Sequence, residues 1–138
     1  MKTKKKIMIT KFDYDRLKSM ILEYSKRNRI DANLDDLLGE IERAQKVDSY
    51  LIPKNIVTMN SIIEIKNEGE YDFKEFQLVF PEDSNLDENK ISILAPIATA
   101  SLGYKTGDFV HWNVPGGEKR FQITNIKYQP EASGHYHL

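Results

Sequence analysis

Apolar residues in the first third of the chain recur at spacings of three and four, the pattern of an amphipathic helix. The first such stripe consists of Tyr14, Leu17, Ile21 and Tyr24, with Met20 widening it. Thr10 followed by Asp13 resembles a weak capping box, so we expect this helix to begin near Lys11. The stripe is narrow, which is typical of a helix that pairs with another helix.

A second stripe follows a connection at residues 25–33. It consists of Leu34, Leu37, Ile41 and Ala44, and it ends near residues 47–48. Asn33 is the expected N-cap of this second helix. Because the two stripes match in spacing, they predict a short antiparallel helical hairpin, a coiled coil, over residues 1–51.

The apolar period then changes from near 3.6 to near 2 around Pro53, which cannot continue a helix. Strands are predicted at residues 56–65, 73–80, 90–94, 108–114 and 119–128. A short helix is predicted between Pro96, which suits a first helical turn, and Gly103, which suits the left-handed residue just past the end. Residues 52–138 are therefore expected to form an antiparallel β-sheet domain with one short helix, which makes the chain α+β.

Charge is distributed unevenly along the chain. Residues 1–30 hold ten Lys and Arg against three Asp and Glu, whereas residues 31–138 hold ten against eighteen. Such asymmetry can mark a surface for nucleic acid or for an acidic partner. We favour another interpretation, in which the acidic second helix lies beside the basic first helix and each screens the other. A further acidic stretch, nine acids against two lysines at residues 64–88, is expected to be a solvated face.

The chain has 138 residues and no cysteine, which excludes disulfides, thiolate zinc sites and a cysteine nucleophile. Its apolar runs fall far short of the ~20 residues of a membrane span. Charges after the lysine-rich start interrupt any signal peptide. We therefore expect a cytoplasmic protein with no membrane partner.

Two groups of residues are candidates for a metal site. Asp31, Asp35 and Asp36 cluster where the predicted hairpin bends back, and such acids can hold Mg²⁺ if a partner supplies further ligands. Helix capping and the helix dipole explain the same acids, and we favour that explanation. His135 and His137 form a pair, whereas a structural site needs about four ligands. We expect neither a metal nor a cofactor.

A different signal comes from Leu94, Ala95, Pro96 and Ile97, which follow a predicted strand at the end of the sheet. Loops at such positions commonly carry contacts with partners. Leu94 and Ile97 are also suited to the core, so the Ala95–Pro96 corner is the part most expected to be exposed.

Several local strings carry a family resemblance. Three of them are Val57-Thr58-Met59-Asn60-Ser61, Leu94-Ala95-Pro96 and Tyr128-Gln129-Pro130-Glu131-Ala132. With these strings the chain resembles the Rnk family, the Gre-related regulators of nucleoside diphosphate kinase. The C-terminal part is similar to the FKBP-like domain of the bacterial Gre transcript-cleavage factors, through Ile91-Ser92, Ala95-Pro96, Ser101-Leu102-Gly103, Gly107-Asp108 and Pro115-Gly116-Gly117.

The resemblance implies binding to RNA polymerase, with the FKBP-like domain at the rim of the secondary channel and the hairpin pointing inward. The rim-contacting corner of Gre factors maps onto Leu94, Ala95 and Pro96, with Ile97 beside it. The resemblance further implies an influence on nucleoside diphosphate kinase or nucleotide metabolism. We expect a monomer that makes no direct sequence-specific contact with nucleic acid.

Gre factors stimulate transcript cleavage with an Asp-x-x-Glu pair at the tip of a long hairpin, where the pair helps to hold Mg²⁺. This chain departs from that pattern, because Leu34 stands three positions after Asp31 and no such pair occurs at residues 25–36. Its first helix, of about 17 residues, would span only ~25 Å. We therefore predict a non-enzymatic regulator that competes with Gre factors at the channel without stimulating cleavage.

The alternative function is that of a peptidyl-prolyl isomerase, because the FKBP-like fold also hosts that activity. Such a site needs an aromatic-lined pocket. The available aromatic residues are Tyr104, Phe109, Trp112, Phe121 and Tyr128. Aromatic residues at strand spacing belong more often to a core than to a pocket.

Overall fold

The computed structural model describes residues 5–27 and 32–138. Its helices and strands are, in order, β1 (Met8–Thr10), α1 (Lys11–Lys26), α2 (Ala32–Arg43), β2 (Gln45–Val47), β3 (Ile62–Asn67), β4 (Phe73–Val79), β5 (Lys90–Ser92), α3 (Pro96–Ser101), β6 (Phe109–Val114) and β7 (Gly117–Tyr128). The prediction of an α+β chain, with N-terminal helices before a mostly antiparallel sheet, is confirmed.

The two N-terminal helices begin and end for local reasons. At the start of α1, the Thr10 hydroxyl accepts a hydrogen bond from the Asp13 main-chain N–H at 2.9 Å, which confirms the predicted cap. α2 begins at Ala32, so Asn33 lies inside the helix and its prediction as the N-cap is wrong. α2 ends at Arg43, earlier than expected, because Gln45–Val47 leave the helix and pair in parallel with β1.

The main sheet has five strands in the order β5-β4-β3-β7-β6. Its pairs are antiparallel except for β4 and β5, so the prediction of an antiparallel sheet is wrong at this edge. The connection at residues 80–89 contains two single-turn 3-10 helices, Pro81–Asp83 and Leu86–Glu88. This connection brings the chain back alongside β4, so that Lys90 of β5 pairs with Gln77. A tight hairpin would have brought an antiparallel strand instead.

The segment at residues 56–61 is a buried turn rather than the first half of a strand. Asn60 has a φ of 67°, and the Ser61 main-chain N–H donates to the Thr58 carbonyl oxygen at 3.1 Å. Val57 and Met59 are fully buried. Their alternation with polar neighbours imitates the period of a strand, which explains the longer strand predicted from the sequence.

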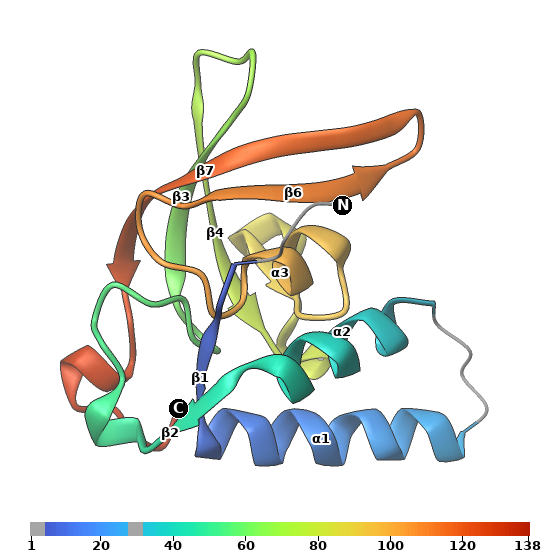
Figure 1. Cartoon of the computed structure of the whole chain (residues 1–138), viewed down its shortest axis with the longest axis vertical. Helices are drawn as coiled ribbons and strands as arrows, with labels where there is room; N and C mark the ends of the chain where they lie inside the picture. The colour runs from blue at the N-terminus through green and yellow to red at the C-terminus, as the bar shows by residue number, and fades with distance from the viewer. Residues whose placement is uncertain (1–4, 28–31) are drawn as a thin grey trace.

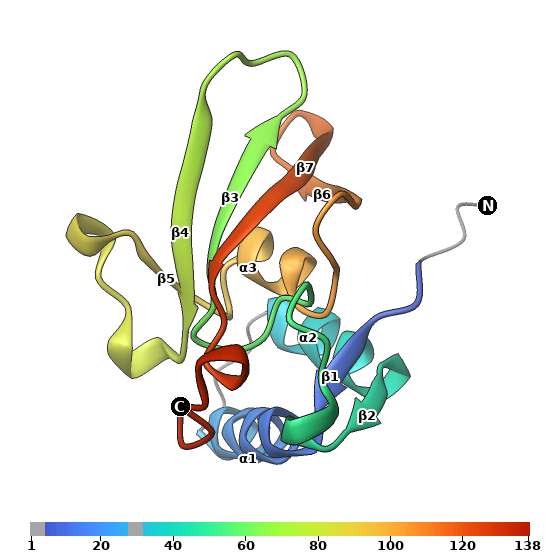
Figure 2. The same ribbon diagram turned by 90° about the vertical axis from the view of Figure 1, so that its left-hand side faces the viewer.

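α3 covers one face of the sheet, and α2 lies between α3 and α1 (Figures 1 and 2). Leu37 and Ile41 of α2 are fully buried, and they belong to the same hydrophobic core as Ile63 and Ile65 of β3. The helices and the sheet therefore share one core, which burial of apolar surface stabilises.

The N-terminal strand β1 ties the helices to the sheet. Its Met8 N–H donates to the Gly103 carbonyl oxygen at 3.2 Å, and on its other side the Gln45 N–H donates to the Ile7 carbonyl oxygen at 3.0 Å. Gly103 follows α3 with a φ of 84°, as predicted. A Cβ atom added there would lie 2.8 Å from the Ile7 Cβ, so the close approach of this strand also requires glycine.

Candidate functional site

The corner formed by Leu94, Ala95, Pro96 and Ile97 joins β5 to α3. The Leu94 N–H donates to the Ser92 hydroxyl at 3.1 Å, and the Ala95 N–H donates to the Ser92 carbonyl oxygen at 2.9 Å. Pro96 is exposed, whereas Leu94 and Ile97 are half-buried and pack against the core. The turn therefore presents Pro96 outward while its two larger apolar neighbours hold it to the domain.

Asn33 binds the start of α2 to this corner. Its side-chain amide donates to the Leu94 carbonyl oxygen and, at 2.8 Å, to the Thr99 hydroxyl. The Thr99 hydroxyl in turn donates to the Ile93 carbonyl oxygen at 2.6 Å. Three parts of the chain, at the beginning of α2, before α3 and within α3, are thus fixed relative to one another.

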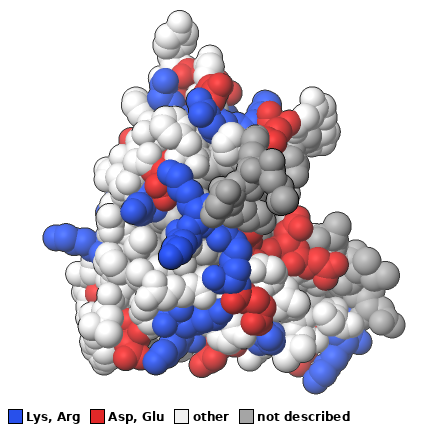
Figure 3. Space-filling view, viewed as in Figure 1, with Lys and Arg blue, Asp and Glu red and all other residues white. Residues whose placement is uncertain are grey.

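Two of the three predicted acidic residues lie in α2 shortly after Asn33, the residue that bonds the corner. Asp35 and Asp36 are both exposed in the first turns of α2, where Figure 3 shows acidic side chains at the surface. Neither has an ion-pair partner within residues 5–27 and 32–138. Asp31 lies outside the described residues. The structure therefore joins the corner at Leu94–Ile97 to the start of α2, the helix that carries Asp35 and Asp36.

Contacts of α1 with α2 and with Asp48, just after β2, support the predicted screening of basic side chains by acidic ones. Glu42 accepts hydrogen bonds from Lys18 at 2.5 Å and from the Tyr14 hydroxyl at 2.8 Å. Lys11 pairs with Asp48 at 3.2 Å. The hydrogen bond with Glu42 raises the pKa of Lys18, and the same bond lowers the pKa of Glu42. These exposed pairs orient the helices and add little free energy each.

Within the part of the chain that the structure describes, no group of three or more His, Asp or Glu side chains is placed to hold a metal ion. His135 and His137 lie in the chain after β7 with ring centroids 6.2 Å apart. The His135 Nδ1 atom bonds the Tyr128 hydroxyl at 2.7 Å. Among the described helices, none has the length and apolar character to cross a bilayer.

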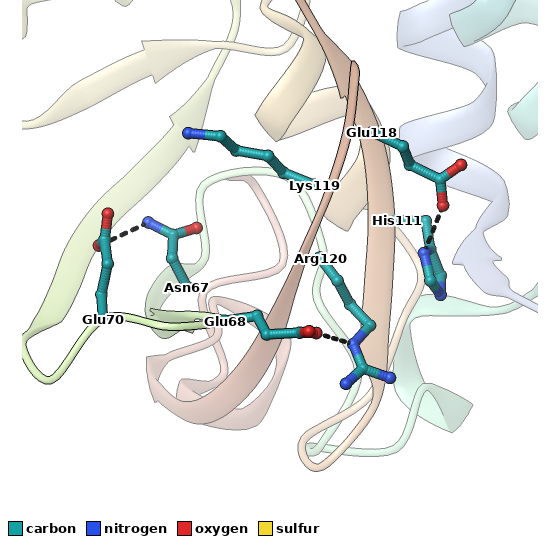
Figure 4. A pocket seen from close by; sticks show the side chains of 7 residues that line it. All are labelled: Asn67, Glu68, Glu70, His111, Glu118, Lys119 and Arg120. Carbon is teal, nitrogen blue, oxygen red and sulfur yellow. Dashed lines mark hydrogen bonds and ion pairs between the residues drawn. The ribbon is translucent and has the colours of Figure 1, made fainter. Parts of the chain in front are cut away.

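The aromatic residues considered for an isomerase pocket have other surroundings. Phe121 is fully buried, and the Trp112 ring meets it edge-on at 6.3 Å. Phe109 is exposed, with the Arg120 guanidinium 4.7 Å from its ring centroid. An open cavity of about 630 Å³ lies at the turn end of the sheet (Figure 4). Polar and charged residues line this cavity, and none of the five aromatic residues does.

A buried junction joins α1 to the turn at residues 56–61. Asp13 is fully buried, and its two carboxylate oxygens accept from Arg16 at 2.5 Å and from the Met59 N–H at 3.0 Å. Burial raises the pKa of Asp13, and these two donors offset part of the rise. The Arg16 guanidinium also lies over the Phe12 and Phe80 rings, 3.9 and 4.8 Å from their centroids.

The chain after β7 completes this junction. The Thr58 hydroxyl donates to a Glu131 carboxylate oxygen at 2.7 Å, and the Gln129 side-chain amide donates to the Ile56 carbonyl oxygen at 2.7 Å. Burial raises the pKa of Glu131, and the nearby charge of Asp13 adds to the rise. Polar groups in such a network are costly to leave unpaired, so the junction fixes how the helices sit on the sheet.

Comparison with known families follows the same division of the chain. Residues 52–128 match the family model described as "Transcription elongation factor, GreA/GreB, C-term". That match covers more than half of the chain. The chain belongs to the GreA/GreB family. Residues 5–47 match a second model, the Rnk N-terminus.

Individual relatives agree with this assignment. The chain is 35% identical over 105 residues to the regulator of nucleoside diphosphate kinase of Escherichia coli K12, covering 75% of this chain and 77% of the relative. It is 28% identical over 105 residues to the transcription elongation factor GreA of Syntrophus aciditrophicus, covering 76% and 65%. A solved GreA/GreB structure from Nitrosomonas europaea is 38% identical, with a TM-score of 0.73 over 89% of this chain and all of the other.

The three strings that this GreA/GreB family member shares with the Rnk family lie in two different parts of the structure. The strings at residues 57–61 and 128–132 meet at the buried junction, through Thr58 and Glu131. The string Leu94-Ala95-Pro96 forms the surface corner instead. The first two strings therefore help to hold the helices against the sheet, whereas the third lies at the surface, where Pro96 is exposed.

The buried junction of Asp13 and the bonds of Asn33 to the corner are not predicted by the sequence patterns described above. Asp13 had a usable signal, because it stands four residues before Leu17 and so falls on the apolar stripe of α1. An acid on an apolar stripe indicates a buried partner. Asn33 carried no such signal, because an amide beside the first residue of a helix is equally typical of a cap.

Proposed function

We propose that this protein is a non-enzymatic transcription regulator that binds RNA polymerase near the secondary channel. In this proposal the surface that docks at the channel rim consists of the corner Leu94–Ile97 and the adjoining first turns of α2. Bound there, the protein competes with Gre factors and does not stimulate transcript cleavage. Membership of the GreA/GreB family supports the choice of polymerase as the partner.

The observation that carries the proposal is the pair of hydrogen bonds from Asn33 to the corner and to α3. They hold the corner that exposes Pro96 against the start of α2, whose Asp35 and Asp36 are exposed and have no ion-pair partner among residues 5–27 and 32–138. An apolar group with charges beside it is a common form of docking surface, in which the apolar contact gives affinity and the charges select the partner.

The residue three positions after Asp31 supports the proposed absence of cleavage stimulation. A carboxylate pair that shares a Mg²⁺ ion must have both groups free to face the polymerase metal. Leu34 takes the position three residues after Asp31, and its side chain is 5% exposed because it packs into the core. That position therefore belongs to the hydrophobic core and carries no ligand for a metal.

The name of the Escherichia coli relative supports an effect on nucleotide metabolism, either through transcription or by contact with a nucleoside diphosphate kinase. We expect the chain to act as a monomer in the cytoplasm. We expect no sequence-specific contact with nucleic acid.

Transcript cleavage in stalled elongation complexes tests this proposal. The protein alone should cause no more cleavage than buffer, and it should suppress Gre-stimulated cleavage as its concentration rises. Pro96→Asp should abolish the suppression, because it places a charge where an apolar contact is required. Pro53→Asp is the matched control, since Pro53 is also exposed but lies outside the corner. Cleavage by the protein alone, or equal suppression by both variants, would contradict the proposal.

A further inference from the structure

The chain after β7 turns back toward the start of α1 (Figures 1 and 2). Residues 132–138 are all exposed, and none of them belongs to the hydrophobic core. The residues just before them differ, because Gln129 and Glu131 are buried and hydrogen-bonded. We call residues 133–138 the tail. It is an exposed segment that leaves a fixed base.

The end of the tail contacts three separate parts of the protein. The Leu138 main-chain oxygen accepts a hydrogen bond from the Arg16 guanidinium of α1 at 2.9 Å. The same oxygen accepts from the side-chain amide of Asn60, in the turn at residues 56–61. The Tyr136 ring lies against the Tyr50 ring, with the two centroids 4.4 Å apart. The tail therefore binds as a peptide ligand does, through one main-chain oxygen and one aromatic ring.

The two donors are held in place by contacts that do not involve the tail. Arg16 bonds the buried carboxylate of Asp13 at 2.5 Å, and its guanidinium lies over two phenylalanine rings. The Asn60 main-chain N–H donates to the Leu78 carbonyl oxygen at 2.7 Å, and the Asn60 carbonyl oxygen accepts from the Gln77 amide at 2.9 Å. Both donors therefore keep their positions when the tail leaves, and a preformed site is filled at a lower entropic cost.

We propose that Arg16, Asn60 and Tyr50 form a binding site for an extended protein segment, and that the tail fills this site as an internal competitor. The partner segment supplies a main-chain oxygen to the two donors and, two residues earlier, an aromatic ring to Tyr50. The oxygen and the ring that now occupy the site define this chemistry. The inference goes beyond the proposed function, because neither the corner at Leu94–Ile97 nor α2 contributes to the site.

The attachment of the tail is suited to exchange. Near its base, the His135 Nδ1 atom bonds the Tyr128 hydroxyl at 2.7 Å, again at an exposed position. A segment with exposed hydrogen bonds and no buried apolar side chain opens without unfolding of the whole protein. A tethered segment has an effective concentration on the order of millimolar, so the tail excludes weak ligands and yields to a segment that binds more tightly.

The test is the binding of a fluorescent peptide of residues 133–138 to the full-length protein, measured by fluorescence anisotropy. The unmodified protein should bind this peptide weakly, because its own tail fills the site. Tyr136→Ala removes the ring contact of the tail, so this variant should bind the peptide at least tenfold more tightly. The matched control is Tyr71→Ala, since Tyr71 is 94% exposed and lies in the β3–β4 connection. This control should bind the peptide no more tightly than the unmodified protein.

Two second substitutions show whether the peptide occupies the site of the tail. Adding Tyr50→Ala to Tyr136→Ala removes the ring that receives the peptide and should abolish the gain. Adding Asn60→Asp should do the same, because aspartate tolerates a positive φ but supplies no donor. Circular dichroism should show the same fold in every variant. No gain in Tyr136→Ala over the unmodified protein, or a gain that survives both second substitutions, overturns the inference.

Discussion

Replacing Asp13 by alanine should weaken the junction between the helices and the sheet. The change removes a fully buried carboxylate that pairs with Arg16 and accepts from the Met59 N–H. The Arg16 side chain is 26% exposed and also donates to the Leu138 carbonyl oxygen at 2.9 Å, so it keeps a partner when the carboxylate is removed. The usual large cost of breaking a buried ion pair, which comes from a buried charge left alone, is therefore reduced. The orphaned Met59 N–H then sets the size of the effect, because an unsatisfied buried donor costs about 1–3 kcal/mol. We expect the unfolding free energy to fall by about 2 kcal/mol.

Urea unfolding followed by far-ultraviolet circular dichroism measures this change. Asp15→Ala is the matched control, because Asp15 lies on the same helix but is exposed. It should change the unfolding free energy by less than about 0.5 kcal/mol. Equal effects of the two substitutions would refute the reasoning, since they would show that the bonds of Asp13 contribute nothing beyond its place near the helix start.

Three further substitutions probe other parts of the account. Gly103→Ala should lower the unfolding free energy by about 3 kcal/mol in urea titrations, because it combines a φ of 84° with a Cβ 2.8 Å from the Ile7 Cβ. Burial raises the pKa of Glu131, so the contribution of Glu131 to the unfolding free energy should fall as the pH rises above about 4 and through the raised pKa. Glu131→Gln keeps the acceptor for Thr58 and should remove part of that fall; parallel curves between pH 4 and 8 would contradict the assignment. Asn33→Ala should weaken polymerase binding at least fivefold while costing only about 1 kcal/mol of stability, and an unchanged affinity would separate Asn33 from docking.

The sequence predicts those helices that bury one face, because burial of one face gives apolar residues a regular spacing. The apolar stripes located α1 and most of α2, and the positions of Pro96 and Gly103 located α3. The pattern failed where apolar and polar residues alternate in a buried loop as they would in a strand, as at Val57 and Met59. It also failed where pairing depends on distant residues, as in the parallel pair of β1 with β2.

The exposure of single residues at the corner could be predicted from the sequence, but their arrangement could not. The position after a strand at the end of the sheet predicts that the Ala95–Pro96 corner is more exposed than Leu94 and Ile97. Pro96 is exposed, whereas Ala95 is half-buried like Leu94 and Ile97. The contact between that corner and the start of α2 depends on the two bonds of Asn33. Their partners lie 61 and 66 positions away from Asn33 in the sequence. Long-range contacts of a single polar side chain leave no periodic trace in a sequence.

Binding of the labelled protein to core RNA polymerase tests the central claim most directly, with an unlabelled Gre factor as competitor. We predict saturable binding that the Gre factor displaces, that Pro96→Asp loses and that Pro53→Asp retains. Absence of saturable binding at micromolar concentrations, or binding that Pro96→Asp leaves unchanged, would contradict docking through the corner at Leu94–Ile97.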